Sequence, residues 1–219
     1  MGGRKRHTSR DARRRTHGQS FLVRQSVVRE FLARAELAPG ERVVEFGAGT
    51  GALTVPLATT GARVIAVERD PAWARQLRER VRAEGLHDRV EVVRADLRAY
   101  ALPRSPYRVV SSPPFALTTD LMRRLCDDPD RGPERADLLV QHEVAVKRAA
   151  EPPATLQSSA WAPWWTFELG PVVPRQAFRP VPRVDGAWLT VRKREPPVLP
   201  TRLAPGFREV LRPAWETGR

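Results

Sequence analysis

Short apolar runs alternate with segments of helical periodicity along most of the chain. Between residues 42 and 150, each apolar run except 89–94 precedes a segment whose apolar side chains recur every three or four positions. This order predicts parallel strands joined by helices, that is, an α/β protein with a doubly wound, mostly parallel sheet. The expected strands are 42–46, 62–67, 89–94, 107–112 and 136–142, and the expected helices are 27–37 (capped by Ser26), 50–60, 71–84, 117–126 and 143–150.

The pattern changes after Pro152 and Pro153. Segments 164–169 and 187–191 alternate apolar and polar residues, which predicts an antiparallel hairpin at the end of the sheet. The proline-rich span 171–182 between them is expected to be an ordered loop, because it also carries Phe178.

No full second domain fits the rest of the chain. We expect one catalytic domain over 19–194, a basic flexible arm over 1–18 and a short basic segment over 195–219. Proline and arginine dominate that last segment, and only a short helix at 206–212 is expected there.

The charge of the chain is concentrated at its two ends. The formal net charge is +13, and residues 1–24 alone carry eight basic residues against one acid. Basic arms of this kind bind polyanions such as RNA, and Arg13, Arg14 and Arg15 are the candidate phosphate contacts. A solvated tail without a ligand is the alternative interpretation of the same charge.

Other composition features narrow the class of protein. A single cysteine, Cys126, excludes a disulfide framework and a zinc cluster, so we expect no metal. The charged N-terminus does not resemble a secretory signal, and no apolar stretch is long enough to span a membrane. We therefore expect a cytoplasmic protein, and we also expect a monomer.

A glycine-rich segment follows the first strand of the alternating region. Val43-Val-Glu-Phe-Gly-Ala-Gly-Thr-Gly51 predicts a buried strand, a tight turn and a helix that opens at Thr50. Its glycines would let a ligand approach the backbone without meeting a Cβ atom. The next two apolar runs end in acids, Glu68 and Asp96, and Glu68 is placed to hydrogen-bond a ribose diol. Open α/β sheets bind ligands at this edge.

Residues 112–115, Ser-Pro-Pro-Phe, follow the fourth expected strand. Two prolines give a rigid, extended backbone whose carbonyl oxygens can accept the hydrogens of an amine. Phe115 supplies a flat surface for a base turned out of its helix. The arrangement suits methylation of an exocyclic amine, and an ordinary proline turn with a core phenylalanine is the alternative.

These motifs together resemble the Erm and KsgA-type ribosomal RNA adenine dimethyltransferases, over about residues 15–194. The resemblance rests on His17-Gly-Gln-Ser-Phe-Leu22, Glu45–Gly51, Ser112–Phe115, Gln141-His-Glu-Val-Ala145 and Phe178-Arg-Pro-Val-Pro-Arg-Val-Asp185, in this order. It implies a Rossmann-like class I methyltransferase fold, S-adenosylmethionine as methyl donor and ribosomal RNA as substrate. The Arg-rich leader and the Pro-Pro-Phe-Ala-Leu-Thr-Thr run favour the Erm branch, which implies 23S RNA and resistance to macrolide-type antibiotics.

The resemblance also assigns roles to individual residues. It implies catalytic roles for Ser112, Pro113 and Phe115, with Ser112 also against the cofactor. The cofactor residues that it implies are Gln19, Ser20, Leu22, Glu45, Gly47, Gly49, Gly51, Glu68, Arg69, Asp96 and Leu97. Glu68 falls on the ribose-binding acid and Asp96 on the acid that recognises adenine, whereas Glu45 is expected to bond loop amides.

Three features depart from the family pattern. Ser20 and Ser112 stand where the family has asparagine, and a serine hydroxyl holds a target amine less rigidly than an asparagine amide. The third is the short segment after the last strand, where the family carries a helical lobe. We therefore expect slower transfer, which stops at one methyl group or shifts to another substrate.

Several alternatives stay open on the sequence. They are a KsgA-like role on small-subunit RNA, methylation of another amine such as a protein side chain, and an RNA-binding module that has lost turnover. Trp161, Trp164 and Trp165 are expected to fill the core rather than stack on RNA, and His142 is expected to be structural.

Overall fold

The computed structural model describes residues 20–104 and 106–217. Gln19, Arg13, Arg14, Arg15 and the rest of the basic arm lie outside the described residues.

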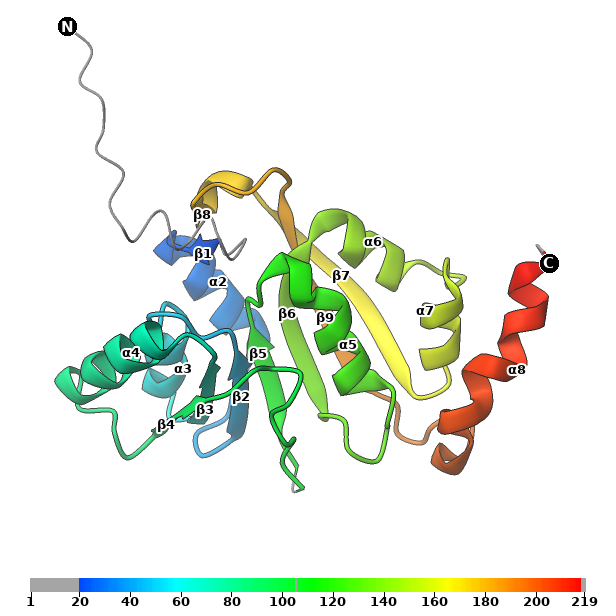
Figure 1. Ribbon diagram of the computed structural model, residues 1–219, viewed down its shortest axis with the longest axis horizontal. Helices are drawn as coiled ribbons and strands as arrows, with labels where there is room; N and C mark the ends of the chain where they lie inside the picture. Colours follow the sequence, from blue (N-terminus) through cyan, green and yellow to red (C-terminus); the bar gives the residue numbers. More distant parts are fainter. Residues whose placement is uncertain (1–19, 105, 218–219) are drawn as a thin grey trace, which may run out of the picture.

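A seven-stranded sheet with the order β4-β3-β2-β5-β6-β9-β7 forms the centre of the molecule (Figure 1). Its first five strands in this order are parallel, and β9 pairs antiparallel with both β6 and β7. This confirms the expected α/β fold with an antiparallel end. The strands are β2 (Arg42–Phe46), β3 (Arg63–Glu68), β4 (Val90–Arg94), β5 (Arg108–Ser111), β6 (Arg135–Gln141), β7 (Trp165–Val173) and β9 (Gly186–Lys193).

Helices cover both faces of this sheet and bury a separate apolar cluster on each. Helices α2 (Gln25–Ala35), α3 (Thr54–Thr59) and α4 (Pro71–Ala83) pack on one face. Helices α5 (Thr118–Cys126), α6 (His142–Ala149), α7 (Leu156–Trp161) and α8 (Ala204–Glu216) pack on the other. In Figure 1, α5, α6 and α7 gather over the half of the sheet formed by β5, β6, β9 and β7.

A second, two-stranded sheet lies beyond the carboxyl ends of the parallel strands. It pairs β1 (Phe21–Leu22) antiparallel with β8 (Phe178–Arg179), although these strands are far apart in the sequence. Three short 3-10 helices complete the described chain: η1 (Phe115–Leu117), η2 (Arg175–Ala177) and η3 (Thr201–Leu203).

The structure corrects several expected boundaries. Helix α3 begins at Thr54 rather than Thr50, because Gly51 has a φ of 87°, which an α-helix does not contain. Helix α2 begins at Gln25, so Ser26 is not its cap. Strand β7 continues to Val173 and takes part of the expected loop.

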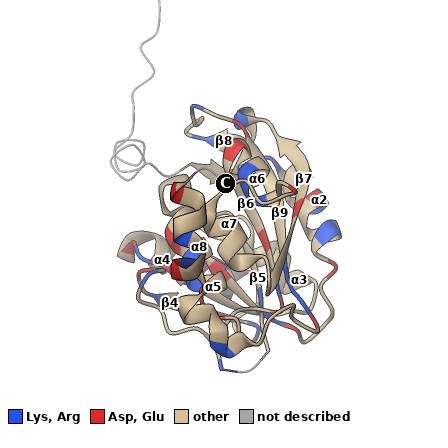
Figure 2. Cartoon of the chain, turned by 90° about the vertical axis from the view of Figure 1, so that its right-hand side faces the viewer, with Lys and Arg blue, Asp and Glu red and all other residues tan. Residues whose placement is uncertain are grey.

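The C-terminal half contains more helix than the sequence pattern predicts. Helix α7 is not expected from it, and α8 extends beyond 206–212 at both ends. Helix α8 carries both signs of charge and runs beside α7 (Figure 2). Its Phe207 ring packs edge-on against Trp164, with ring centroids 5.5 Å apart. The three tryptophans 161, 164 and 165 are buried in the core, as predicted.

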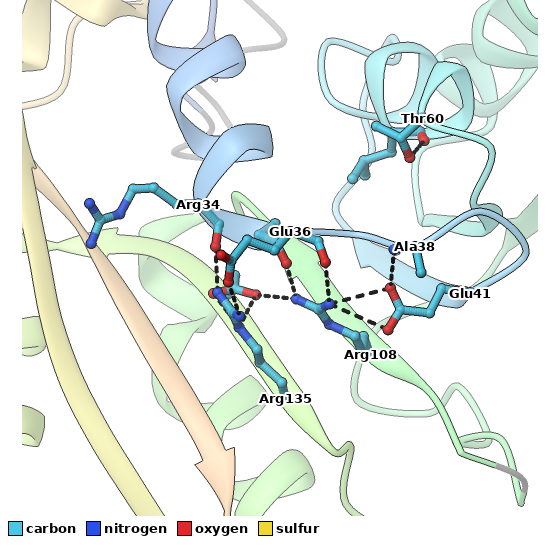
Figure 3. A network of polar contacts seen from close by, with 10 residues as sticks. Arg34, Glu36, Ala38, Glu41, Thr60, Arg108 and Arg135 are labelled. Atoms are coloured by element: carbon cyan, nitrogen blue, oxygen red, sulfur yellow. Dashed lines mark hydrogen bonds and ion pairs between the residues drawn. The ribbon is translucent and has the colours of Figure 1, made fainter.

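A buried network of charges ties α2 to the sheet (Figure 3). Arg108 and Arg135 lie opposite each other at the starts of β5 and β6, and both form ion pairs with the buried carboxylate of Asp137, at 3.1 Å and 2.9 Å. Arg108 also donates to the carbonyl oxygens of Ala35 and Glu36, and Arg135 to that of Arg34. The last carbonyls of a helix lack partners within it. The two arginines supply partners here and so fix the end of α2.

Candidate active site

The glycine-rich turn after β2 contacts the Ser-Pro-Pro-Phe segment directly. Gly47 has a φ of 72°, and its N–H donates to the carbonyl oxygen of Val67 at 2.9 Å. A Cβ atom on Gly47 would lie 3.0 Å from Cδ of Pro114. Only glycine combines this backbone conformation with such a close approach. The two motifs, more than sixty residues apart, therefore form one site.

Gly49 brings the N-terminal motif to the same turn. Its N–H donates to Oε2 of Glu68 at 2.8 Å, and its φ is 55°. A Cβ atom there would overlap the ring of Phe21, which packs edge-on against Trp73 with ring centroids 4.7 Å apart. Phe21 of β1 therefore lies over the glycine turn. Gly51 has a different neighbour, because a Cβ atom on it would collide with Leu77 of α4.

Glu68 ends β3 as a buried carboxylate with hydrogen-bonding capacity to spare. Oε1 accepts from the N–H of Asp70 at 2.7 Å, and Oε2 accepts from Gly49. Burial raises the pKa of Glu68, and the bonds from these two N–H groups oppose that rise. The backbone N–H of Arg69 also interacts with this carboxylate. Because the two carboxylate oxygens can together accept four hydrogen bonds, acceptor capacity remains for a ligand hydroxyl group, as a ribose-binding role requires.

Asp96 follows β4 and is held by two arginines. Its Oδ2 accepts from Arg98 at 2.8 Å and from Arg69 at 3.5 Å, and its Oδ1 accepts from the backbone N–H and the Nε of Arg98. The hydrogen bonds from Arg98 hold the pKa of Asp96 well below its usual range. Asp96 is therefore ionised at neutral pH. All four of its acceptor sites are engaged, so an amine ligand would replace one of the arginine contacts.

Glu45 lies behind the glycine turn and is buried. Thr54 donates its hydroxyl to Oε2 of Glu45 at 2.5 Å, so Glu45 bonds the first turn of α3 rather than the loop amides that we expected. Burial raises the pKa of Glu45 to about 8, with a smaller contribution from the neighbouring charge of Glu68. Glu45 is therefore protonated at neutral pH.

This raised pKa makes one component of stability depend on pH. An unfolded glutamate loses its proton near its ordinary pKa of 4.5, whereas folded Glu45 keeps it to about pH 8. The free energy of unfolding should therefore fall by about 1.4 kcal/mol per pH unit between these values. Glu45→Gln should remove this slope, because the neutral amide mimics the protonated acid. Urea denaturation at pH 5, 6.5 and 8 measures it, with the exposed Glu79→Gln as control. A wild-type slope equal to that of Glu45→Gln would contradict the prediction.

Strand β5 delivers the catalytic segment to the site. The side chain of the buried Ser111 accepts a hydrogen bond from the N–H of Phe46 at 2.6 Å, beyond the residues at which β2 and β5 pair. Its side chain thus replaces a strand-to-strand bond, and the two strands separate at the ligand-binding edge. Ser112 follows half-buried, and Pro113 is buried. Among the described residues no side-chain hydrogen bond engages Ser112, so its hydroxyl is available to a ligand.

The ring of Phe115 contacts an aromatic side chain that is distant in the sequence. Its ring packs edge-on against Phe178 of β8, with centroids 5.8 Å apart. Because Phe178 pairs with Leu22 in the small sheet, that sheet connects the N-terminal motif with Phe115. His142 also contacts this region, since its N–H donates to the carbonyl oxygen of Asp185 at 3.0 Å.

A pocket between these motifs is lined by five of the twelve predicted cofactor residues: Gly47, Glu68, Arg69, Asp96 and Leu97. Ser20 is half-buried and Leu22 is buried in the core cluster, and neither lines this pocket. The sequence pattern did not single out Phe21, Pro114 or Leu117 as site residues. Pro114 could have been found from its place in the motif. The pocket is lined by Gly47, Val67, Glu68, Arg69, Ala95, Asp96, Leu97, Pro114 and Leu117.

The site fits a nucleoside-bearing methyl donor. Glu68 can accept from a ribose hydroxyl, and Asp96 can accept from an adenine amine that replaces one of its arginine contacts. The same edge holds Ser112, a proline-stiffened backbone and the ring of Phe115.

In the described ranges 20–104 and 106–217, no helix is long and apolar enough to cross a membrane.

Comparisons with known proteins agree with this geometry. The family model described as ribosomal RNA adenine dimethylase matches residues 10–215. An rRNA adenine N-6-methyltransferase from Corynebacterium diphtheriae is 36% identical over 198 residues, covering 90% of this chain and 76% of that protein. The mycinamicin-resistance protein MyrB from Micromonospora griseorubida is 38% identical over 198 residues, and the match spans 61% of its length and 90% of this chain.

Two further relatives are named for different ribosomal RNAs. The crystal structure of the 23S rRNA methyltransferase ErmE matches with a TM-score of 0.77 and 30% identity, over 88% of this chain and 77% of that one. A ribosomal RNA small subunit methyltransferase A from Thermosynechococcus vestitus is 34% identical over 206 residues, which cover 90% of this chain and 76% of that protein. With a family model that matches nearly its whole length, the chain belongs to the ribosomal RNA adenine dimethylase family.

Proposed function

We propose that this protein methylates the exocyclic amine of an adenine in 23S ribosomal RNA, with S-adenosylmethionine as donor. The observation that carries the proposal is the contact between the glycine turn and the Ser-Pro-Pro-Phe segment, at Gly47 and Pro114. A donor held by the turn, Glu68 and Asp96 would lie beside the segment that orients the amine. The donor supplies an activated methyl group on a cationic sulfur, so no strong general base is required of the protein.

Each residue of the segment would have a separate task. Ser112 and the carbonyl oxygen of Pro113 accept the amine hydrogens and so direct its lone pair. Phe115 stacks on the adenine that has left its helix. Catalysis then depends mostly on positioning and on local electrostatics. Ser20, Leu22, Gly51 and Glu45 support the turn that holds the donor, and Gln19 would close over it.

The choice of 23S over small-subunit RNA rests on the named relatives. MyrB is named for resistance to a macrolide, and ErmE for action on 23S rRNA. Resistance to macrolide-type antibiotics is the outcome that this target implies. A small-subunit methyltransferase is also similar, so a KsgA-like role is the second candidate. Incubation of each RNA with a donor that carries a labelled methyl group separates the two. We expect label on 23S RNA, and label on small-subunit RNA alone would overturn the proposal.

Restoring asparagine at position 112 should accelerate the reaction. An asparagine amide presents a fixed acceptor, whereas a serine hydroxyl is shorter and rotates. Loss of one transition-state hydrogen bond costs about 10²–10³ in rate, so Ser112→Asn should gain at least roughly tenfold in single-turnover rate. Transfer of labelled methyl groups to RNA measures the rate.

Ser111→Asn is the matched control for this experiment, because Ser111 bonds Phe46 and not the site. It should give no gain. If Ser112→Asn also gives none, and the wild type binds the donor without turnover, the protein is an RNA-binding module instead. If the labelled methyl group of the donor appears on protein and not on RNA, an amine of a protein side chain is the true acceptor.

The remaining assignments follow from the substrate. Ribosomal RNA places the reaction in the cytoplasm, and Arg13, Arg14 and Arg15 would contact its phosphates, which position an RNA without reading its sequence. We propose that the protein acts as a monomer without a metal ion. Light scattering and activity in the presence of EDTA test these two points.

A further inference from the structure

A second hollow lies at the opposite edge of the sheet from the candidate active site. It is a groove of about 800 Å³ over the amino ends of β2, β3 and β4. Its apolar floor includes Ile65, Tyr100 and Pro103, and its basic residues are Arg42, Arg63, Arg89 and Arg104, with His87. None of the motifs of the methyltransferase site reaches it.

The groove exists because the connection between β4 and β5 leaves part of a sheet face without a helix. Residues 95–104, 106 and 107 form turns and extended chain. The opposite face of β3 and β4 is packed against α4. The same connection joins the two sites, since Asp96 and Leu97 line the cofactor pocket whereas Tyr100 and Arg104 line the groove.

The basic residues of the groove outnumber its acids. Four arginines line it, whereas its acids are Asp88 and Glu91. In the described part of the chain, Arg63 and Arg104 are exposed and have no carboxylate within ion-pairing distance. An anionic ligand can therefore pair with these two guanidinium groups.

The other charged residues of the groove do not cancel this potential. Asp88 lies 3.6 Å from His87, and Arg89 donates to the carbonyl oxygen of Ala58 at 3.5 Å. Glu91 is the remaining acid, and its charge acts on Tyr100 together with that of Arg42. Arg63 and Arg104 are therefore the two guanidinium groups best placed to meet an external anion.

We propose that this groove binds the phosphate backbone of the substrate RNA, at a distance from the adenine that is methylated. The inference rests on the proposed function. Strand β3 runs from Arg63 at the groove to Glu68 at the cofactor pocket, and its five residue steps span roughly 17 Å. This corresponds to roughly five base pairs along a duplex. An RNA arm longer than this reaches the groove, whereas a shorter arm does not.

The salt dependence of RNA binding tests the proposal. The double variant Arg63→Gln/Arg104→Gln removes two phosphate contacts, and Arg75→Gln/Arg82→Gln, on exposed positions of α4, removes the same charge elsewhere. The probes are 23S rRNA hairpins that contain the target adenine with an arm of either three or ten base pairs. For the long arm, the groove variant should lower the slope of log K against log salt by about 1.4–1.8. That change corresponds to roughly 25- to 60-fold weaker binding at 0.1 M salt.

The other measurements separate this proposal from the proposed function. Donor binding by calorimetry and binding of the short hairpin should match the wild type in both double variants. An unchanged slope for the groove variant, or an equal loss in the α4 variant, would overturn the groove proposal even if RNA methylation is found. A wild type that methylates neither hairpin while its long-arm slope depends on Arg63 and Arg104 would overturn the proposed function alone.

Discussion

Replacing Asp137 with alanine should lower the free energy of unfolding by about 3–5 kcal/mol, the largest stability effect that we expect from a single substitution. The carboxylate is 2% exposed and neutralises two arginines that are themselves buried, Arg108 and Arg135. Its removal leaves Arg108 and Arg135 paired only with Glu41 and Glu36, two carboxylates that are more exposed to solvent than Asp137. Two buried guanidinium groups then lose their one buried carboxylate, which costs far more than the ion pairs contribute on their own. It also loosens the groups that hold the end of α2, and α2 follows directly after the β1 strand that places Phe21 over the glycine turn.

Urea denaturation followed by circular dichroism measures this effect. Asp88→Ala is the matched control, because it also removes an aspartate with a basic neighbour, but one whose side chain is 89% exposed. Exposed ion pairs contribute about 0–1 kcal/mol, so that variant should stay within 1 kcal/mol of the wild type. Asp137→Asn should fall between the two, because the amide keeps an acceptor for the arginines. A loss below about 1 kcal/mol for Asp137→Ala would show that the network does not anchor the fold.

Phe115→Ala should lower kcat/KM for RNA methylation by about 10- to 100-fold while leaving affinity for the methyl donor unchanged. Stacking of a base on an aromatic ring contributes about 1–3 kcal/mol, and Phe115 is the ring that the catalytic segment presents. Phe115→Trp should preserve most of the activity, since it keeps a flat surface of similar orientation. Calorimetric titration with the donor and single-turnover kinetics at saturating donor distinguish the two effects.

Phe207→Ala controls for loss of an aromatic contact as such. Phe207 is half-buried like Phe115, and its ring makes a similar edge-on contact, with Trp164 instead of Phe178. The Phe207→Ala variant should have a lower free energy of unfolding than the wild type. Its kcat/KM should be unchanged at temperatures where it is folded. If the kcat/KM of Phe115→Ala stays within twofold of the wild-type value, the ring of Phe115 does not stack on the adenine.

The sequence pattern predicted the sheet well because its signals are local. Each parallel strand is a short apolar run, and the glycines and acids that follow β2, β3 and β4 mark where these strands end. The predicted start of α3 was wrong, and the reason is also local. Thr50 resembles a helix cap in sequence, but the positive φ of Gly51 delays the helix until Thr54.

The sequence pattern could not predict contacts between residues that are far apart in the chain. Arg108 and Arg135 begin strands and would be expected in solvent, yet Asp137 and the end of α2 allow their burial. The hydrogen bond of Ser111 to Phe46 and the packing of Phe178 on Phe115 depend on strands that meet only in the folded chain. Sequence could thus predict five of the nine residues that line the candidate pocket, but not what holds the Ser-Pro-Pro-Phe segment in place.

Mass spectrometry of 23S RNA nucleosides tests the central claim most directly. Purified protein is incubated with deproteinised 23S RNA and S-adenosylmethionine that carries a deuterated methyl group, and the RNA is then digested. We expect RNA treated with the wild-type protein to contain N6-methyladenosine with the isotopic label, at one adenine. RNA treated with Phe115→Ala should contain far less of it. Label on another nucleoside, or no label on RNA although the protein binds the donor, would contradict it.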